Sequence, residues 1–151
     1  MYSTTGSPTD SLLILPARDT PLPTRMVAYA KTLLGTRYVF GCSAPSIGFD
    51  CSGFINHIFD HFNITVPRSS VDFTNAGTTI PLHEALPGDL ILFTGTNSNL
   101  RAVGHIGMIV ANNAEGIQFI HASSGKENAV IITTLDDRYM QRFVKVVRME
   151  K

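Results

Sequence analysis

The stretch from Gly48 to Phe54, which reads Gly-Phe-Asp-Cys-Ser-Gly-Phe, constrains this chain more than any other segment. It places Cys51 in the first turn of a predicted helix, directly after Asp50, which is a candidate N-cap residue. Apolar residues follow Cys51 at helical spacing and form a stripe: Phe54, Ile55, Ile58, Phe59 and Phe62. Because Cys51 falls on the same side as this stripe, we expect its thiol to face the body of the fold, at the rim.

A cysteine at the start of a helix is a candidate nucleophile. The unpaired N–H groups and the partial positive charge of a helix N-terminus favour the thiolate form. Two histidines follow: His105, flanked by Gly104 and Gly107, and His121. We predict that the strands beginning at His105 and ending at His121 pair as a hairpin, which would bring the two imidazoles together as a base and its orienting group. The sequence therefore predicts a cysteine hydrolase or acyl-transfer site formed by Cys51, His105 and His121.

Each of these residues also has a structural interpretation. Cys51 could be a buried small hydrophobic residue, and His105 could be a strand histidine satisfied by a neighbour. Cys42 and Cys51 could form a disulfide in an exported protein. Zinc binding by Cys51 and the two histidines is a further alternative, although the chain has no Cys-x-x-Cys knuckle. Tyr38 could pack in the core or donate a hydrogen bond to a developing oxyanion. The other histidines are assigned to the surface or to a helix face: His57, His61 and His83.

The composition is that of an ordinary globular chain of one domain. Its 151 residues are 44% hydrophobic and 16% charged, and the formal net charge is zero. No basic run suggests nucleic-acid binding, and no apolar run is long enough to cross a bilayer. The apolar residues 12–15 lack the basic region of an export signal, so no such signal is visible. We expect a monomer that binds neither a metal nor another cofactor.

The order of the predicted elements is helices first and an antiparallel sheet second, which is an α+β layout. Residues 1–20, rich in Ser, Thr and Pro, are expected to be extended or mobile, and 21–151 to form the domain. Thr24 is the expected N-cap of a first helix over 25–34, and a second helix is expected over 51–62, then a short one ending near Gly77. Strands are expected over 90–93, 105–110, 117–121, 130–133 and 143–147, with a short helix near 136–140.

Six short motifs, in this order, resemble those of the NlpC-type bacterial cell-wall cysteine peptidases. They lie at residues 35–41, 48–54, 66–70, 86–93, 104–107 and 119–124. The resemblance covers the chain from about Arg25 to its C-terminus. It implies a papain-like α+β fold in which N-terminal helices pack on a central antiparallel β-sheet.

The resemblance also implies roles for individual residues. Cys51 would be the nucleophile, His105 the general base and His121 the polar residue that orients the base. Three more residues would line the substrate site, the first of them near the oxyanion: Tyr38, Asp50 and Ser52.

The activity that the resemblance implies is hydrolysis of amide bonds in peptidoglycan stem peptides through a thioester on Cys51. The bond cut would join D-γ-glutamate to a diamino acid such as meso-diaminopimelate or lysine. Such proteins act outside the cytoplasm, in the periplasm or cell envelope. A papain-like acyltransferase or amidase with a non-wall substrate, and a catalytically silent wall-binding module, remain open alternatives.

Overall fold

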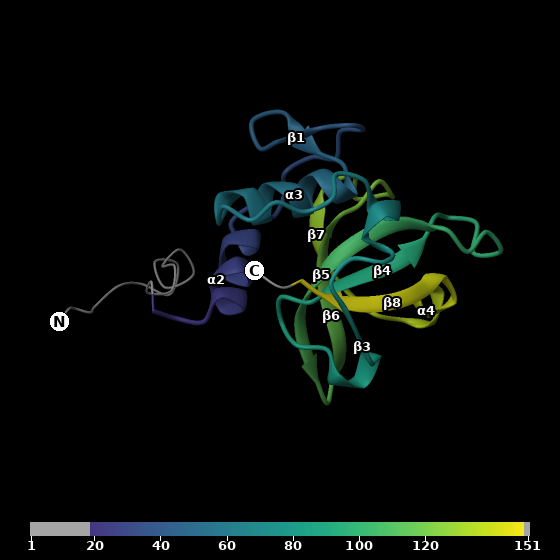
Figure 1. Cartoon of the computed structure of the whole chain (residues 1–151). Helices are drawn as coiled ribbons and strands as arrows, with labels where there is room; N and C mark the ends of the chain where they lie inside the picture. Colours follow the sequence, from purple (N-terminus) through teal and green to yellow (C-terminus); the bar gives the residue numbers. More distant parts are fainter. Residues whose placement is uncertain (1–18, 150–151) are drawn as a thin grey trace.

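The structure, a computed structural model, describes residues 19–149. Most of the predicted extended segment 1–20, with its apolar residues 12–15, lies outside the described residues. The described part has the predicted α+β layout, with helices first and an antiparallel sheet second (Figure 1). Its helices are α2 (Leu22–Lys31), α3 (Cys51–His61) and α4 (Asp137–Arg142), and its 3-10 turns are η1 (Ser70–Phe73) and η2 (Leu82–Glu84). Its strands are β1 (Ser43–Ala44), β2 (Gly48–Phe49), β3 (Thr78–Ile80), β4 (Leu90–Thr94), β5 (Val103–Asn113), β6 (Gly116–Ala122), β7 (Val130–Thr134) and β8 (Phe143–Arg148).

The main sheet has six strands in the order β3-β8-β4-β5-β6-β7, and every neighbouring pair is antiparallel. All five predicted strands are present. Strand β5 is longer than predicted, because it begins at Val103 and continues to Asn113. The sequence prediction missed β3, a three-residue edge strand that pairs only with β8, and the short β1–β2 pair within the loop that precedes α3.

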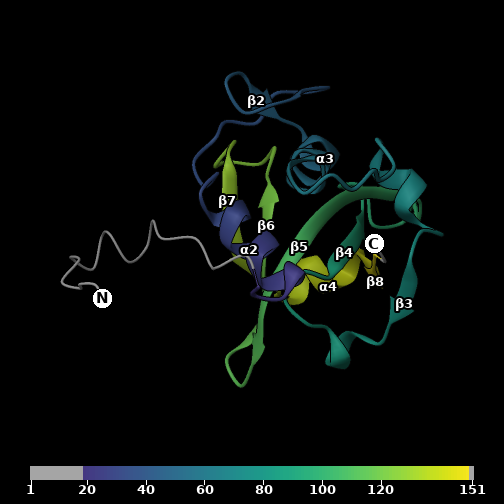
Figure 2. The same cartoon turned by 60° about the vertical axis from the view of Figure 1, so that its left-hand side comes forward.

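The sheet is buried on both faces. Side chains alternate across β4, so that Leu90 and Leu92 join one core and Ile91 and Phe93 join the other. The larger core includes the buried residues of α2 and α3, and the smaller core packs against Tyr139 of α4. Figures 1 and 2 show α2 and α3 next to each other, with α4 lying beside β8.

The first helix differs from its prediction at both ends. It begins at Leu22 with Pro21 as N-cap and ends at Lys31, so Thr24 is not the N-cap. Pro23 falls in the first turn, where its missing N–H costs nothing because that group would have no helical partner. After the helix, Gly35 adopts a φ of 89° and its N–H donates to the Val130 carbonyl, which joins the helix exit to β7.

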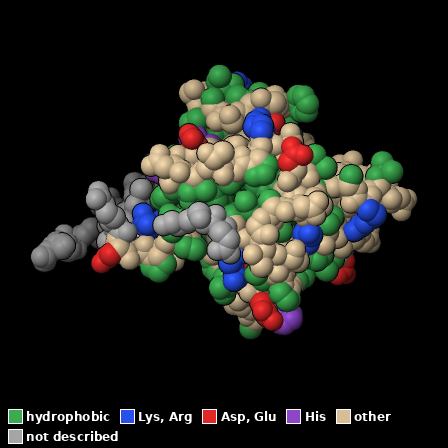
Figure 3. Space-filling view, in the orientation of Figure 1, with side chains coloured by type: hydrophobic (Ala, Val, Ile, Leu, Met, Phe, Trp, Pro, Cys, Tyr) green, Lys and Arg blue, Asp and Glu red, His purple; other side chains and the backbone are tan. Residues whose placement is uncertain are grey.

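Charged side chains are scattered singly over the face shown in Figure 3, without a broad basic patch. Between residues 19 and 149, no helix has the length and apolar character needed to cross a membrane.

Candidate active site

The N-terminus of α3 is built around Asp50, as the sequence predicts. Asp50 Oδ1 accepts a hydrogen bond from the Gly53 N–H at 2.6 Å, and Oδ2 accepts one from the Gly41 N–H at 2.9 Å. Position 53 must be glycine, because a Cβ there would collide with the carbonyl oxygen of Cys42. The loop backbone therefore crosses directly over the first turn of α3 and fixes where Cys51 begins the helix.

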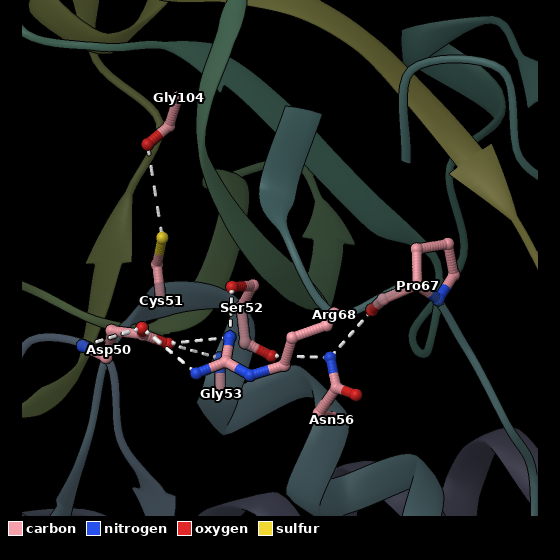
Figure 4. A network of polar contacts seen from close by, with 9 residues as sticks. Asp50, Cys51, Ser52, Gly53, Asn56, Pro67, Arg68 and Gly104 are labelled. Atoms are coloured by element: carbon pink, nitrogen blue, oxygen red, sulfur yellow. Dashed lines mark hydrogen bonds and ion pairs between the residues drawn. The ribbon is translucent and has the colours of Figure 1, made fainter. Parts of the chain in front are cut away.

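Cys51 faces the body of the fold, as predicted, and is 9% exposed. Its Sγ lies 4.0 Å from the carbonyl oxygen of Gly104, the residue that directly precedes His105 (Figure 4). Helix α3 therefore presents the sulfur to the start of β5. Cys42 and Cys51 are both free thiols, so the disulfide alternative is wrong. Within residues 19–149, no group of three or more His, Cys, Asp or Glu side chains could hold a metal ion.

The two histidines meet across the β5–β6 hairpin, as the sequence predicts. His105 Nε2 lies 2.7 Å from His121 Nδ1, and the rings are nearly perpendicular at 78°. Gly107 makes this approach possible, because a Cβ at that position would press against His121 Cβ at 3.2 Å and Phe119 Cδ2 at 2.9 Å. His105 Nδ1 has no hydrogen-bond partner among residues 19–149, whereas Nε2 is engaged by His121.

The histidine pair continues into a third side chain, which the sequence prediction missed. His121 is fully buried, and its Nε2 lies 2.8 Å from Thr133 Oγ1 on β7. The two nitrogens of His121 are therefore both occupied, one by His105 and one by the threonine hydroxyl. This arrangement holds the His121 ring in one orientation against His105.

Arg68 ties together two of the predicted site residues, Asp50 and Ser52. Its Nη2 lies 3.2 Å from Asp50 Oδ2, and its Nη1 donates to Ser52 Oγ at 2.8 Å (Figure 4). Asn56 holds the arginine's segment against α3, because its Nδ2 donates to the carbonyls of Ser52 and Pro67 at 3.0 and 2.7 Å. Arg68 lies within the 66–70 motif, but no role was predicted for it from the sequence.

Tyr38 lies at the same end of α3. Its backbone forms an isolated parallel β-bridge with Phe49 of β2, and its phenol makes no hydrogen bond within residues 19–149. Burial raises the pKa of Tyr38 above its usual value, and the neighbouring acidic groups of Cys51 and Asp50 raise it further. The phenol therefore keeps its proton and can donate it in a hydrogen bond. This end of α3 therefore brings together four residues: Tyr38, Asp50, Cys51 and Ser52.

The sequence led us to expect an easily ionised thiol at Cys51, but the structure shifts the pKa of Cys51 in the opposite direction. Burial raises the pKa of the Cys51 thiol, and the charge of Asp50 adds to this effect, against smaller opposing contributions from backbone hydrogen bonds. Burial, followed by His121 and Arg142, holds the pKa of His105 well below its usual value. Burial and Arg142 lower the pKa of His121 to about 3. The resting site therefore contains a neutral thiol and neutral imidazoles.

The remaining histidines lie away from this site, as expected. His57 Nε2 lies 2.8 Å from the hydroxyl of Tyr29, and the His61 ring stacks on the Tyr29 ring at 3.8 Å. His83 is exposed beside Glu84. His57 and His61 therefore belong to the packing between α2 and α3, and His83 belongs to the surface.

The sequence and the fold both match known proteins. Residues 35–149 match the NlpC/P60 family. The chain is 39% identical over 110 residues to the protein of Escherichia coli (strain K12) named probable endopeptidase NlpC, covering 72% of this chain and 65% of that protein. It is 38% identical over 97 residues to the bifunctional muramidase/DL-endopeptidase CwlT of Bacillus subtilis (strain 168), covering 60% of this chain and 29% of that protein.

The crystal structure of an NlpC/P60 family protein from Bacillus cereus ATCC 10987 superposes with a TM-score of 0.74 and 28% identity. This match covers 85% of this chain and 40% of that one. The chain thus spans less than two thirds of the length of each of these relatives. The family match covers most of the chain and all the residues that meet around Cys51, and the chain belongs to the NlpC/P60 family.

Proposed function

We propose that this protein is a cysteine peptidase that hydrolyses amide bonds in the stem peptides of peptidoglycan. The observation that carries the proposal is the position of Cys51: its sulfur meets the residue before His105, and His121 engages the far nitrogen of the His105 ring. A nucleophile, a base and an orienting group in this order are the components of thiol-based acyl transfer. The similarity to proteins named DL-endopeptidase and gamma-DL-glutamyl hydrolase supports the D-γ-glutamyl–diamino acid bond as the target.

The reaction begins from the neutral pair. As Cys51 Sγ attacks the amide carbonyl, its proton passes to His105 Nδ1, and the carbonyl oxygen becomes an oxyanion. The Tyr38 phenol, which burial keeps protonated, donates a hydrogen bond to that oxyanion. The imidazolium then gives its proton to the leaving nitrogen, the C–N bond breaks, and the acyl group remains on Cys51 as a thioester. Water, deprotonated by His105, hydrolyses the thioester and restores the thiol.

The part of the site that would contact the acyl group consists of Asp50, Ser52 and Arg68. The Asp50 carboxylate and the Arg68 guanidinium lie at the start of α3, beside the nucleophile. A D-γ-glutamyl residue carries a free α-carboxylate, and the stem peptide ahead of it can carry a free ammonium. One fixed cation beside one fixed carboxylate suits such a dipolar acyl group.

The remaining expectations follow from this function. The partner is the peptidoglycan stem peptide, the place of action is outside the cytoplasm, and the catalytic cycle above uses no cofactor. The proposal also takes the protein to act as a monomer, and its mechanism needs side chains from one copy only.

The direct test is mass spectrometry of the tripeptide L-Ala-γ-D-Glu-meso-diaminopimelate after incubation with the protein. Release of L-Ala-D-Glu and free diaminopimelate by the parent protein, and not by Cys51→Ala, is the expected result. Cys42→Ala is the matched control, because it removes the other thiol and should leave cleavage unchanged. If no stem peptide is cleaved by folded protein, the proposal is wrong, and transfer to a different acceptor or substrate becomes the better explanation.

A further inference from the structure

An apolar groove of about 660 Å³ lies at the end of α3 that is farther from Cys51. It is lined by side chains from the start of α2, the end of α3, the turn before β4 and the residues after β8. Two of them, Met26 and Phe59, are almost fully buried, whereas Leu86 is 55% exposed. The groove is therefore an open extension of the larger core, and its apolar side chains include Leu22, Met26, Phe59, Ile64, Leu86 and Met149.

The charged side chains that border the groove are paired with each other. Arg148 Nε lies 2.8 Å from Asp89 Oδ1, and Arg148 Nη2 lies 2.9 Å from Asp89 Oδ2. The Leu86 N–H also donates to Asp89 Oδ2, at 2.8 Å. Both carboxylate oxygens are therefore occupied, so an occupant of the groove is bound chiefly by apolar contact.

The groove does not belong to the site around Cys51. No residue assigned to the reaction lines it. Cys51 begins α3, and Phe59 lies eight residues further along the same helix, which is a rise of about 12 Å. An occupant of the groove therefore lies too far along α3 to contact the thiol.

The segment that precedes α2 has the chemistry that the groove requires. Residues 12–15 read Leu-Leu-Ile-Leu, within a stretch that is otherwise rich in Ser, Thr, Pro and Asp. Four adjacent apolar side chains are costly to leave in water, and their burial against other apolar groups is favourable.

The attachment point of this segment lies at the groove itself. Leu22, Pro23 and Thr24, the first residues of α2, form part of the groove wall. Leu15 precedes Leu22 by seven residues, which span at most about 25 Å when extended. A short tether of this kind gives an effective concentration on the order of millimolar, which favours this segment over a second copy of the chain.

We propose that the groove binds residues 12–15 of the same chain. The bound segment covers Met26 and Phe59 and joins both helices to the turn before β4. That turn is already fixed on its other side, because the Gly88 N–H donates to the Ile109 carbonyl. The segment thus holds α2 and α3 against the sheet at the end of α3 opposite Cys51, and it stabilises the fold without taking part in catalysis.

Thermal denaturation of the full chain is the first test. The quadruple variant Leu12→Ser/Leu13→Ser/Ile14→Ser/Leu15→Ser should melt about 5–10 °C below the parent protein, since several apolar side chains lose their buried contacts. The matched control is Ser3→Ala/Thr4→Ala/Thr5→Ala/Ser7→Ala, which changes four polar residues of the same segment and should melt within about 1 °C of the parent. An unchanged melting temperature in the quadruple variant would overturn the inference.

A substitution on the groove side shows whether the two partners are coupled. Leu86→Ser should lower the melting temperature more in the parent protein than in the quadruple variant, because only the parent has a segment that covers Leu86. Leu100→Ser is the control, since Leu100 is 66% exposed and does not line the groove, so its effect should be the same in both. Equal effects of Leu86→Ser in the two proteins would contradict the proposed contact.

Methyl NMR of methionine-labelled protein locates the contact. The signals of Met26 and Met149, which line the groove, should differ between the parent and the quadruple variant, and that of Met140 on α4 should not. Unchanged Met26 and Met149 signals would overturn the inference. For a contact within one chain, the melting temperature of the parent is independent of protein concentration; an increase with concentration would identify a second copy as the occupant instead.

Cleavage of the diaminopimelate tripeptide separates this inference from the proposed function. Where both proteins are folded, kcat/KM should be the same in the parent and the quadruple variant. A gain of activity in the variant would mean that residues 12–15 cover the Cys51 site, and the groove would then be the wrong place. Absence of cleavage by either protein would overturn the proposed function, while the melting and NMR results would still decide this inference.

Discussion

His105 Nε2 lies 2.7 Å from His121 Nδ1, and this contact leaves Nδ1 as the ring nitrogen of His105 that acts as the base in the proposed mechanism. For His105 Nδ1 to accept a proton, Nε2 must carry one and donate it to His121 Nδ1. His121 then carries its own proton on Nε2 and donates it to Thr133 Oγ1, 2.8 Å away. The productive tautomer of His105 is therefore supported by a chain of two hydrogen bonds that ends on a threonine hydroxyl.

Thr133→Val is expected to lower kcat about tenfold or more with little change in KM. The variant keeps the shape of the side chain but leaves the buried His121 Nε2–H without an acceptor, and an unsatisfied buried donor costs about 1–3 kcal/mol. His121 can then adopt the other tautomer, in which it donates to His105 and places the His105 proton on Nδ1. Steady-state kinetics on the diaminopimelate tripeptide measures both constants.

Thr133→Ser is the control for this prediction, because it restores a hydroxyl at the same position. Activity close to that of the parent protein in Thr133→Ser, together with the loss in Thr133→Val, assigns the effect to the hydrogen bond. An equal loss in both variants would mean that Thr133 acts by packing, and the role proposed for the hydroxyl would be wrong.

The parts of the site that sequence analysis predicted are those governed by short-range pattern. The N-cap and apolar stripe place Cys51, and the turn between β5 and β6 is short enough for one hairpin to bring His105 to His121. Thr133 was missed because its contact depends on the register between β6 and β7, which are joined by the longer loop 123–129. No periodicity in the sequence encodes that register.

Electrostatic features were harder to predict than positions. The helix N-terminus suggested an easily ionised Cys51, but the sequence does not show how deeply the tertiary fold buries the thiol, and burial has the larger effect on its pKa. Likewise, Arg68 lies sixteen residues from Ser52 and reaches it only because Asn56 holds the Pro67 carbonyl against α3. Long-range packing of this kind leaves no local signal.

Asp50→Ala is expected to lower the free energy of unfolding by about 1–2 kcal/mol, the usual cost of losing an N-cap. The substitution removes the acceptor for the Gly53 and Gly41 N–H groups. Arg68→Ala should cost less than about 1 kcal/mol, because the arginine side chain is 45% exposed and its ion pair is screened by solvent. Urea denaturation measures both changes.

Asp60→Ala is the matched control for Asp50→Ala, since Asp60 is an exposed aspartate on the same helix without a capping role. Its stability should remain within about 0.5 kcal/mol of the parent protein. Equal losses in Asp50→Ala and Asp60→Ala would show that the cap does not stabilise α3.

The stability of the fold is expected to fall with acidification below about pH 6.5, the ordinary pKa of histidine. His105 and His121 have lowered pKa values in the folded protein, the latter about 3, so the unfolded chain binds protons first as the pH decreases. Each proton bound only by the unfolded chain costs about 1.4 kcal/mol of stability per pH unit. Thermal denaturation from pH 7 to pH 4 measures this slope.

His121→Asn tests the origin of that slope. Asparagine can still accept a hydrogen bond from His105 but does not titrate, so the melting temperature should decrease less steeply with pH than in the parent protein. An unchanged slope would show that the acid sensitivity comes from other groups. His83→Asn is the control, because His83 is exposed and should not affect the slope.

Cys51 is expected to alkylate with a pH midpoint at or above that of a free thiol, about 8.5, in the protein without substrate. The reason is that burial raises the pKa of the thiol while lowering that of His105, so a thiolate–imidazolium pair is disfavoured at rest. Iodoacetamide labelling of Cys42→Ala, followed by mass spectrometry from pH 5 to pH 10, reports Cys51 alone. A midpoint well below 8.5 would instead establish a preformed ion pair and place proton transfer before substrate binding.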